Sequence, residues 1–347
     1  MKIYKNLYDQ IISLENLFLS WDKFRLGKMR KNDVMEFYLD LELNIIKLNE
    51  ELSSNTYEHG RYVSFYIHDP KQRHINKALV RDRVLHHSIF SILNPIFEAT
   101  YISHSFSCRD GKGTHVGFKA LADMLRWVSG NGRKQCYGLK CDIKKFFDSV
   151  DHKILKEIIS KKIKDEKVLW LVGIVINSYI SKRSNLFERK GIPIGNLTSQ
   201  LFANVYMNEL DQFVKHKLKV KEYVRYTDDF VIVSCDREYL EDIKREIDAF
   251  LQTRLKLGLH PNKVFIRKFG QGIDFLGYVT KPHHVLMRTK TKKRMFKKLK
   301  SNSKKFNQGL VDITTLEQSL QSYLGVLSHA DAFGLSEKVK NDYWLWL

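Results

Sequence analysis

The four residues 226–229, Tyr-Thr-Asp-Asp, constrain the fold of this chain more than any other stretch. They join two runs rich in Val, Ile, Tyr and Phe, at 222–226 and 230–233. Two such runs separated by a short polar turn predict a β-hairpin, with Asp228 and Asp229 at its tip. Asp tolerates turn geometry, so a plain structural turn is one interpretation. The other is a cation site, because adjacent carboxylates repel one another and Mg²⁺ prefers hard oxygen ligands.

A second acidic segment strengthens the cation interpretation. Residues 139–152 begin as a strand, predicted over 139–147, and then fill with aromatic and acidic side chains. Within it, Asp142 at a strand end can face the hairpin tip across a sheet. Three carboxylates placed in this way can hold two metal ions roughly 4 Å apart, the spacing used for in-line phosphoryl displacement. One ion would activate the attacking hydroxyl and the other the leaving group.

Several further motifs occur in a fixed order around these aspartates. They lie at 73–78 with 81–83, 105–115, 139–152, 191–200, 226–229, 257–263 and 275–278. With these motifs the chain resembles a reverse transcriptase. The resemblance implies an α+β fold of the right-hand polymerase type, with fingers, palm and thumb. It also implies an antiparallel palm sheet that carries the Tyr-Thr-Asp-Asp hairpin.

The resemblance and the hydrophobic periodicity together divide the chain into four parts. We expect an N-terminal helical extension over 1–60, fingers over 61–135, a palm with an interleaved finger segment over 136–280, and a basic helical thumb over 281–347. Apolar periodicity predicts a helix from about 7 to 24, and 33–36 (Asp-Val-Met-Glu) predicts a capping box that opens a second helix. A strand is expected at 62–67. Further helices are expected at about 80–93, 115–129, 151–162, 166–180, 198–216 and 238–257.

The resemblance assigns the catalytic roles residue by residue. Asp142, Asp228 and Asp229 are the expected metal ligands, and Ile143 is expected to add its backbone carbonyl. The expected cofactor is a pair of Mg²⁺ ions, with Mn²⁺ as a possible substitute. Lys263 matches the family's candidate general acid, which protonates pyrophosphate.

Other positions match the nucleotide-binding parts of the family. Phe147 matches the bulky gate that rejects a 2′-hydroxyl, although a core Phe is the competing interpretation. Lys71 and Arg73 would neutralise the incoming triphosphate, unless they are ordinary surface charges. Ile194 and Gly195 correspond to the pair that borders the nascent base pair.

Ile194 is the most informative departure from the family pattern, since most reverse transcriptases have Gln there. An Ile side chain offers only its shape, so a polar contact that checks base-pairing geometry is lost. Loss of one such contact should lower the selectivity for the correct nucleotide roughly ten-fold. Residues 194–200, Ile-Gly-Asn-Leu-Thr-Ser-Gln, resemble the reverse transcriptases of diversity-generating retroelements. Those enzymes copy a template-repeat RNA with frequent errors at adenines. They act with a small, basic helical accessory protein, which we therefore expect as a partner.

The charge of the chain agrees with a nucleic-acid partner. Lys and Arg number 59 against 39 Asp and Glu, giving a net charge of +20. Such an excess favours polyanions, because neutralised phosphates release counterions. The densest basic run, 288–300, predicts a thumb helix lying along an RNA/DNA hybrid, with a solvated helix face as the alternative. The expected contacts come from six cations: Lys290, Lys292, Lys293, Arg294, Lys297 and Lys298.

Cysteine spacing and hydropathy indicate the compartment. The four cysteines, at 108, 136, 141 and 235, form no Cys-x-x-Cys pair and are expected to be reduced thiols. No apolar run approaches the roughly 18 residues of a membrane span. We expect a cytoplasmic protein without membrane contact.

Three functions remain open on sequence grounds. The first is the error-prone, RNA-directed DNA polymerase of a diversity-generating retroelement, using a template RNA and dNTPs. The second is a related antiphage defence reverse transcriptase with a dedicated non-coding RNA. The third is a catalytically inert RNA-binding chaperone with a polymerase fold, against which the three intact aspartates argue.

Overall fold

The structure of the chain, a computed structural model, describes residues 2–68, 72–185 and 188–346. By its internal contacts the chain forms two compact units, each built from three separate segments. The first unit comprises Met1–Ser103, Ile143–Lys219 and Glu246–Pro261. The second comprises His104–Asp142, Val220–Arg245 and Asn262–Leu347.

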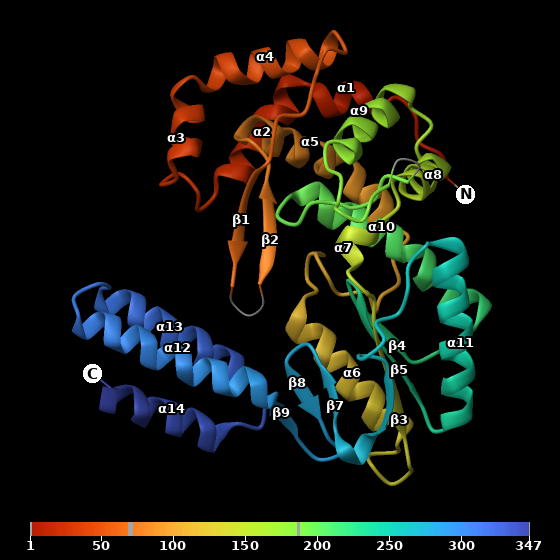
Figure 1. Cartoon of the computed structure of the whole chain (residues 1–347), viewed down its shortest axis with the longest axis vertical. Helices are drawn as coiled ribbons and strands as arrows, with labels where there is room; N and C mark the ends of the chain where they lie inside the picture. The colour runs from red at the N-terminus through yellow and green to blue at the C-terminus, as the bar shows by residue number, and fades with distance from the viewer. Residues whose placement is uncertain (1, 69–71, 186–187, 347) are drawn as a thin grey trace. The chain divides into compact units, whose positions relative to one another are not determined.

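The first unit is mainly helical (Figure 1). Its α-helices are α1 (Tyr8–Ile12), α2 (Leu14–Arg25), α3 (Asn32–Leu39), α4 (Leu41–Ser53), α5 (Val80–Glu98), α7 (Phe146–Ser149), α8 (His152–Lys162), α9 (Glu166–Asn177) and α10 (Leu197–Gln212). A π-helical turn, Phe213–Lys217, continues α10. Two antiparallel strands, β1 (Val63–Ile67) and β2 (Arg73–Lys77), form a hairpin in this unit. Helix α11 (Arg237–Arg254) contributes residues to both units.

The prediction of a single helix over 7–24 is wrong, because the helix is interrupted at Ser13, between α1 and α2. Ser13 has an extended ψ of 141°, which ends α1, and its hydroxyl accepts a hydrogen bond from the backbone amide of Asn16 at 3.2 Å, which caps α2. A serine is favoured at such a position because its oxygen satisfies an otherwise unpaired amide of the first turn. Much of the predicted apolar face is nevertheless buried, with Ile11, Leu17 and Trp21 at most 2% exposed, whereas Leu14 is 41% exposed.

The capping box predicted at Asp33 is also wrong. Lys31 occupies the N-cap position of α3, and no side chain caps that helix. Asp33 instead accepts hydrogen bonds from Lys77 Nζ at 2.8 Å and from Arg83 Nη2 at 2.6 Å. Its carboxylate therefore links α3 to β2 and α5.

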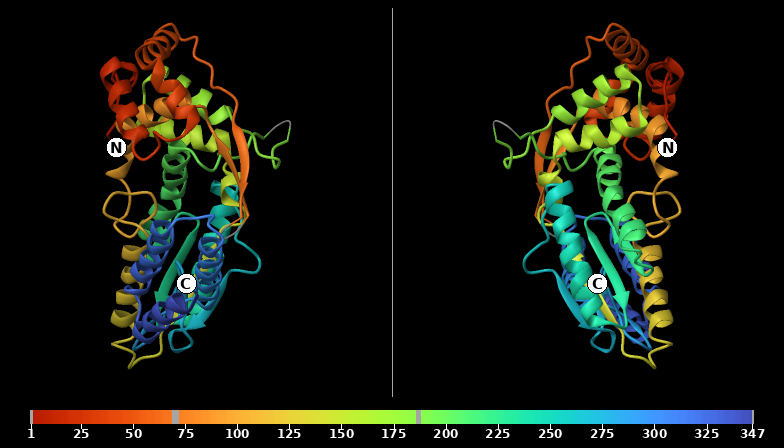
Figure 2. Two further views of the ribbon diagram at one scale, coloured as in Figure 1. Left: turned by 90° about the vertical axis from the view of Figure 1, so that its left-hand side faces the viewer. Right: turned by 90° about the vertical axis from the view of Figure 1, so that its right-hand side faces the viewer.

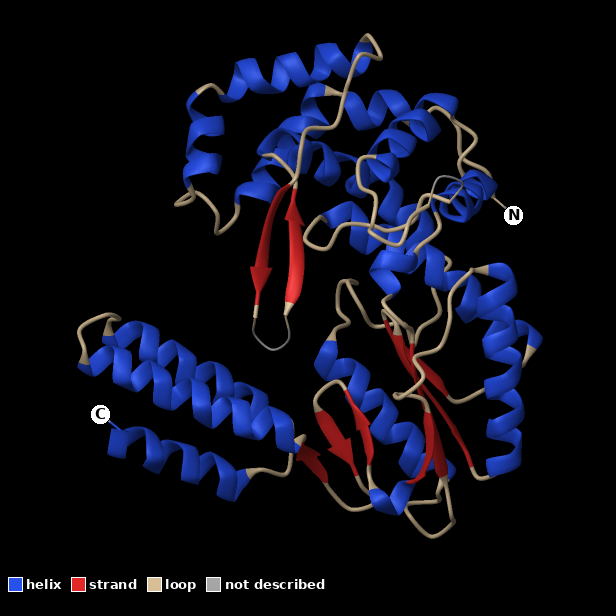
Figure 3. Ribbon diagram, in the orientation of Figure 1, coloured by secondary structure: helices blue, strands red, loops and turns tan. Residues whose placement is uncertain are grey.

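The second unit contains the larger sheet, in the order β4-β5-β3-β6 (Figure 3). The strands are β3 (Tyr137–Asp142), β4 (Tyr223–Tyr226), β5 (Asp229–Ser234) and β6 (Phe265–Lys268), and every neighbouring pair is antiparallel. Helix α6 (Thr114–Val128) covers one face with Phe118, Leu121 and Leu125, which pack in one core with strand residues Val224 and Val231. Strand β3 ends at Asp142, so the strand predicted over 139–147 extends too far.

Two further layers complete the second unit. A three-stranded antiparallel sheet contains β7 (Ile273–Phe275), β8 (Tyr278–Thr280) and β9 (Val285–Met287). Three helices follow, α12 (Thr289–Asn307), α13 (Ile313–Leu327) and α14 (Phe333–Trp346), and they lie side by side (Figures 1 and 2). Met295, Leu299, Leu316 and Val339 are fully buried in the core that these helices share. The mixture of helices with antiparallel sheets confirms the predicted α+β class.

None of the helices within the described ranges combines the length and the apolar character that crossing a lipid bilayer would require.

Candidate active site

The Tyr-Thr-Asp-Asp turn joins β4 to β5 at one end of the strands of the larger sheet. Tyr226 and Asp229 form the last pair between β4 and β5, and Thr227 and Asp228 make the turn between them. On the neighbouring strand, Asp142 pairs with Asp229 across the β3–β5 ladder. The structure therefore places the three aspartates at the same end of the sheet.

The surroundings of Asp228 and Asp229 disfavour the charged forms of their carboxyl groups. Burial, together with the nearby Asp142 and Asp229, raises the pKa of Asp228 to about 6. Burial also raises the pKa of Asp229, against the opposing effect of Lys140. Keeping these groups ionised at neutral pH thus costs free energy in the folded protein. A cation bound beside them would remove that cost.

Two lysines supply part of the missing positive charge. Lys263 Nζ lies 2.8 Å from Asp142 Oδ1, and Lys140 Nζ lies 3.2 Å from Asp229 Oδ2. Lys140, with a side chain only 10% exposed, also donates to the backbone carbonyl of Asp274 at 2.9 Å. Lys140 was not predicted from the sequence. Its position two residues before Asp142 could have revealed it, since residues i and i+2 of a strand share one face.

The three aspartates fit a metal ion by their chemistry. Asp229 Oδ1 is buried and has no hydrogen-bond partner among the described residues. Buried polar atoms are normally satisfied, so this oxygen indicates a missing cation or donor. In the arrangement seen, no three His, Cys, Asp or Glu side chains of the described ranges converge closely enough to hold an ion. Asp142 would have to leave Lys263 to complete the set, together with Asp228 and Asp229.

A strained turn positions Asp228. Thr227 has φ +54°, a left-handed conformation that a β-branched residue rarely adopts. Its hydroxyl donates to Ser107 Oγ at 2.6 Å, and its carbonyl accepts from Arg225 Nη1 at 3.0 Å. Arg225 is fully buried and also donates to Ser105 Oγ at 3.0 Å. Side chains of the 105–115 motif thus hold the hairpin tip, a contact that the sequence did not predict.

Binding of Mg²⁺ should stabilise the folded protein through these carboxylates. At a concentration about ten times its Kd, the ion should raise Tm by roughly 2–5 °C at neutral pH. A thermal unfolding scan with and without MgCl₂ measures the shift. The Asp228→Asn/Asp229→Asn variant should show no shift, and an equal shift in that variant would place the ion elsewhere.

Three of the residues predicted to bind nucleotide, Phe147, Ile194 and Gly195, lie on one local framework in the first unit. The carbonyl of Phe147 accepts a hydrogen bond from the amide of Ile192 at 2.8 Å, and the carbonyl of Ile194 accepts one from the amide of Asn76 at 3.0 Å. The 191–195 segment is thereby fixed between α7 and β2. Phe147 is half-buried, with its ring edge-to-face against the buried Phe146 at 5.4 Å between centroids.

Gly195 is required by the close approach of this segment to β2. It has φ +115°, and a Cβ atom there would come within 2.8 Å of Ile75 Cγ2. Arg73 begins β2 and is exposed. Lys71, its predicted companion, lies outside the described residues. Ile143, predicted to offer its carbonyl to the metal, is 1% exposed and forms an isolated bridge with Leu259 in the first unit.

The predicted nucleic-acid contacts all lie on α12. Met295 and Leu299 of this helix are fully buried in the core, as the apolar stripe in the sequence indicated. Of the six predicted cations, Arg294 is half-buried. The other five are exposed: Lys290, Lys292, Lys293, Lys297 and Lys298. The helix therefore presents a strongly cationic surface.

Comparison with known proteins decides the family. The family model described as "Reverse transcriptase (RNA-dependent DNA polymerase)" matches residues 68–280, which is more than half of the 347 residues. The chain belongs to the reverse transcriptase family. This membership confirms the predicted enzyme class, an RNA-directed DNA polymerase, and the right-hand polymerase fold that goes with it.

Relatives at low identity support the same family. Protein YkfC of Escherichia coli is 25% identical over 71% of this chain and 72% of its own length. The group II intron-encoded protein LtrA of Lactococcus lactis is 26% identical over 68% of this chain, and nuclear intron maturase 1 of Arabidopsis thaliana is 26% identical over 80%. The chain spans about half the length of each of these two intron proteins. Among solved structures, apo telomerase of Candida tropicalis has a TM-score of 0.47 at 12% identity, covering 72% of this chain and 60% of that one.

Proposed function

We propose that this protein extends a primer on an RNA template, using dNTPs and two Mg²⁺ ions, and so makes cDNA. The observation that carries the proposal is the meeting of Asp142, Asp228 and Asp229 at one end of an antiparallel sheet. The unpartnered Asp229 Oδ1 and the raised pKa of Asp228 both call for a cation at that point. The proposal extends a family membership that already implies polymerase chemistry.

The aspartates hold the ions, with Ile143 offering its backbone carbonyl. When bound, the ions supply Lewis-acid stabilisation of the attacking and leaving oxygens. Mn²⁺ offers similar oxygen coordination and is the expected substitute. Lys263 is paired with Asp142 in the structure, and it would donate a proton to the pyrophosphate group when Asp142 holds a metal ion instead. Lys140 stays on Asp229 and keeps that carboxylate oriented.

The nucleotide is held by residues of the first unit. Phe147 excludes a 2′-hydroxyl, Ile194 and Gly195 border the nascent base pair, and Arg73 with Lys71 neutralises the triphosphate. The hydrogen bonds from Ile192 to Phe147 and from Asn76 to Ile194 support this assignment, because they fix both positions on one local framework. We assign residues 1–60 to an N-terminal extension, 61–135 to fingers, 136–280 to the palm with an interleaved finger segment, and 281–347 to the thumb.

Helix α12 lies along the phosphate backbone of the template–product hybrid. Its exposed lysines offer charge without base-reading groups, which suits contacts that position a duplex irrespective of its sequence. The similarity to an intron-encoded protein and to an intron maturase also favours an RNA partner. Four cysteines without disulfides favour a reducing compartment, and we place the protein in the cytoplasm.

The finer role that we propose is that of the error-prone reverse transcriptase of a diversity-generating retroelement. It rests on Ile194 and the residues that follow it, which replace the family's usual Gln pattern. The half-buried Ile194 side chain has no hydrogen-bonding group with which to test base-pair geometry. A small, basic helical accessory protein completes the proposed system.

Replacing Ile194 by Gln should lower misincorporation opposite template adenine several-fold, because the amide restores a polar contact near the nucleotide. The experiment is to sequence cDNA made by wild type and Ile194→Gln on one RNA of balanced composition. Ile194→Val, which keeps an apolar branched side chain, is the matched control and should leave the errors unchanged.

The outcomes of this experiment separate the alternatives. Absence of cDNA would contradict polymerase function itself. Low errors in the wild type would argue against the retroelement role and favour a defence reverse transcriptase that copies a dedicated non-coding RNA. Frequent errors at template adenine in the wild type, Ile194→Gln and Ile194→Val alike would support the retroelement role. They would also show that Ile194 does not cause the errors.

A further inference from the structure

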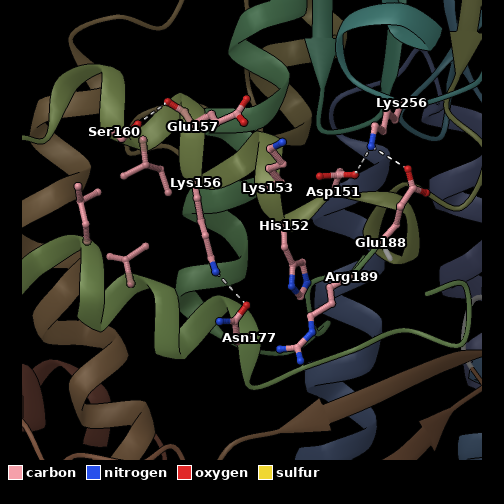
Figure 4. Close-up of a pocket in the computed structure, with 13 residues that line it drawn as sticks. Asp151, His152, Lys153, Lys156, Glu157, Ser160, Asn177, Glu188, Arg189 and Lys256 are labelled. Atoms are coloured by element: carbon pink, nitrogen blue, oxygen red, sulfur yellow. Dashed lines mark hydrogen bonds and ion pairs between the residues drawn. The ribbon is translucent and has the colours of Figure 1, made fainter. Parts of the chain in front are cut away.

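A cavity in the first unit contains none of the residues assigned above to DNA synthesis. It has a volume of about 560 Å³ and lies between α8 and α9, where residues 188–189 and Lys256 complete its wall (Figure 4). That volume is typical of small-molecule sites, which range over roughly 300–1,000 Å³. Its apolar wall residues are Ile159, Leu169 and Val172, of which Leu169 is half-buried and the other two are 1% exposed.

The four cations that line this cavity fall into two groups. Lys256 is already neutralised, since its Nζ lies 3.1 Å from Asp151 Oδ2 and 2.7 Å from Glu188 Oε1. The other three are Lys153, Lys156 and Arg189. Within the described part of the chain, no carboxylate oxygen lies within 4.0 Å of their charged atoms. These three cations therefore form no close ion pair with the described residues, although the exposed Glu157 also lines the cavity.

Lys156 is the cation with the most restricted surroundings. It is half-buried, and its Nζ donates to the neutral side-chain oxygen of Asn177 at 3.0 Å (Figure 4). Burial lowers the pKa of Lys156, and the positive charge of Arg189 lowers it further. Two cations that repel one another beside a cavity favour a multiply charged anion placed between them.

His152 adds no charge to the cavity wall. It is 3% exposed, and its Nε2 lies 2.7 Å from the carbonyl oxygen of Gly191, so this nitrogen carries the proton. Burial lowers the pKa of His152, although Gly191, Asn177 and Asp151 each raise it in part. The neutral His152 thus lies in the same wall as Lys156 and Arg189, two cations without a close ion pair among the described residues.

We propose that this cavity binds one nucleotide, with its phosphate between Lys156 and Arg189 and its base against the half-buried Leu169. A phosphate fits the cation pair better than a single carboxylate, because it carries more charge and more acceptor oxygens. Lys153, on the exposed side of α8, adds attraction at the mouth. The nucleotide comes either from the free pool or from an RNA strand, and the two sources share this chemistry.

Chemical acetylation of lysines, followed by mass spectrometry of the full chain, tests the proposal locally. The reaction is run in EDTA without dNTPs, so that its outcome does not depend on DNA synthesis. The probes are 5′-AMP, a short single-stranded RNA, inorganic phosphate and an acidic peptide. Lys161 is the internal control, because it lies on the same helix but pairs with Glu209 at 2.8 Å and does not line the cavity.

The expected result is slower acetylation of Lys156 with AMP, with RNA or with both, and no change at Lys161. Protection by AMP identifies a free nucleotide as sufficient, whereas protection by RNA alone identifies a nucleotide within a strand. Absence of protection by both would overturn the proposal. Equal protection by inorganic phosphate or by the acidic peptide would also overturn it, since the site would then bind anions in general.

A variant pair gives an independent measure. Lys156→Gln/Arg189→Gln should weaken binding of the protecting probe about ten- to hundred-fold, since two charge-assisted hydrogen bonds are lost. Lys161→Gln, which removes one charge from the same helix, should bind as the wild type does. Equal affinity in all three proteins would contradict the assignment of the phosphate to Lys156 and Arg189.

Discussion

DNA synthesis should disappear, and RNA binding should persist, when Asp228 and Asp229 are both replaced by Asn. We expect this result because Asn keeps the shape of each side chain but removes the charge that holds the metal ions. Metal ions contribute several kcal/mol of transition-state stabilisation, so the rate should fall at least about thousand-fold. Primer extension on an RNA template with dNTPs and Mg²⁺ measures the rate. Filter binding of the same RNA measures the retained affinity.

A second readout separates loss of chemistry from loss of folding. The pKa of Asp228 is raised from 3.8 to about 6, so its ionisation destabilises the folded state as pH rises through that window. Asn bears no charge and avoids this cost. Without Mg²⁺ at pH 7, the double variant should therefore unfold at the same temperature as the wild type or at a higher one.

The matched control is Asp123→Asn/Asp242→Asn. Both aspartates belong to the second unit, and each is exposed and paired with an Arg three residues on. This control removes the same number of charges outside the sheet end, so it should polymerise normally. Undiminished synthesis by Asp228→Asn/Asp229→Asn would contradict the proposed active site.

Replacing Phe147 by Ala should relax the choice of sugar. If the half-buried ring excludes a 2′-hydroxyl, its removal opens space, and the ratio of kcat/KM for rGTP to that for dGTP should rise about 10–200-fold, the range that steric pockets provide. Steady-state incorporation of each nucleotide on one primer-template measures the ratio.

Phe147→Tyr is the control for the sugar experiment, since it retains the ring and should keep the wild-type ratio. Its neighbour Phe146 is 1% exposed and belongs to the core, so the two adjacent rings differ in exposure. An unchanged ratio in a folded, active Phe147→Ala protein would make Phe147 a packing residue like Phe146.

The hairpin and the strand pairing were predictable because they depend on local patterns. Apolar alternation on both sides of residues 226–229 predicted β4 and β5, and the polarity of Thr227 and Asp228 predicted the turn. The alignment of Asp142 with Asp229 followed from the need for both to end adjacent strands. The buried stripe of α12 was likewise visible as Met295 and Leu299 among lysines.

Helix boundaries were less predictable where a single residue decides them. Apolar periodicity continues through Ser13, so only the hydrogen bond from Asn16 to its hydroxyl shows that one helix ends and another begins. At Asp33 a local capping pattern competed with two distant cations. Lys77 and Arg83 hold that carboxylate, and neither is near it in the sequence.

The sequence by itself determined the family, the antiparallel hairpin and the three aspartates, because these depend on residue type and on spacing along the chain. Tertiary structure alone decided what surrounds them. Lys140 and Lys263 approach the carboxylates from β3 and from the segment before β6, and Ser107 holds the strained Thr227 from 120 residues away. The cavity beside Lys156 and Arg189 arises in the same way, from segments that folding brings together. The pKa values of these groups depend on their burial and on the charges near them, and only the folded arrangement determines those two properties.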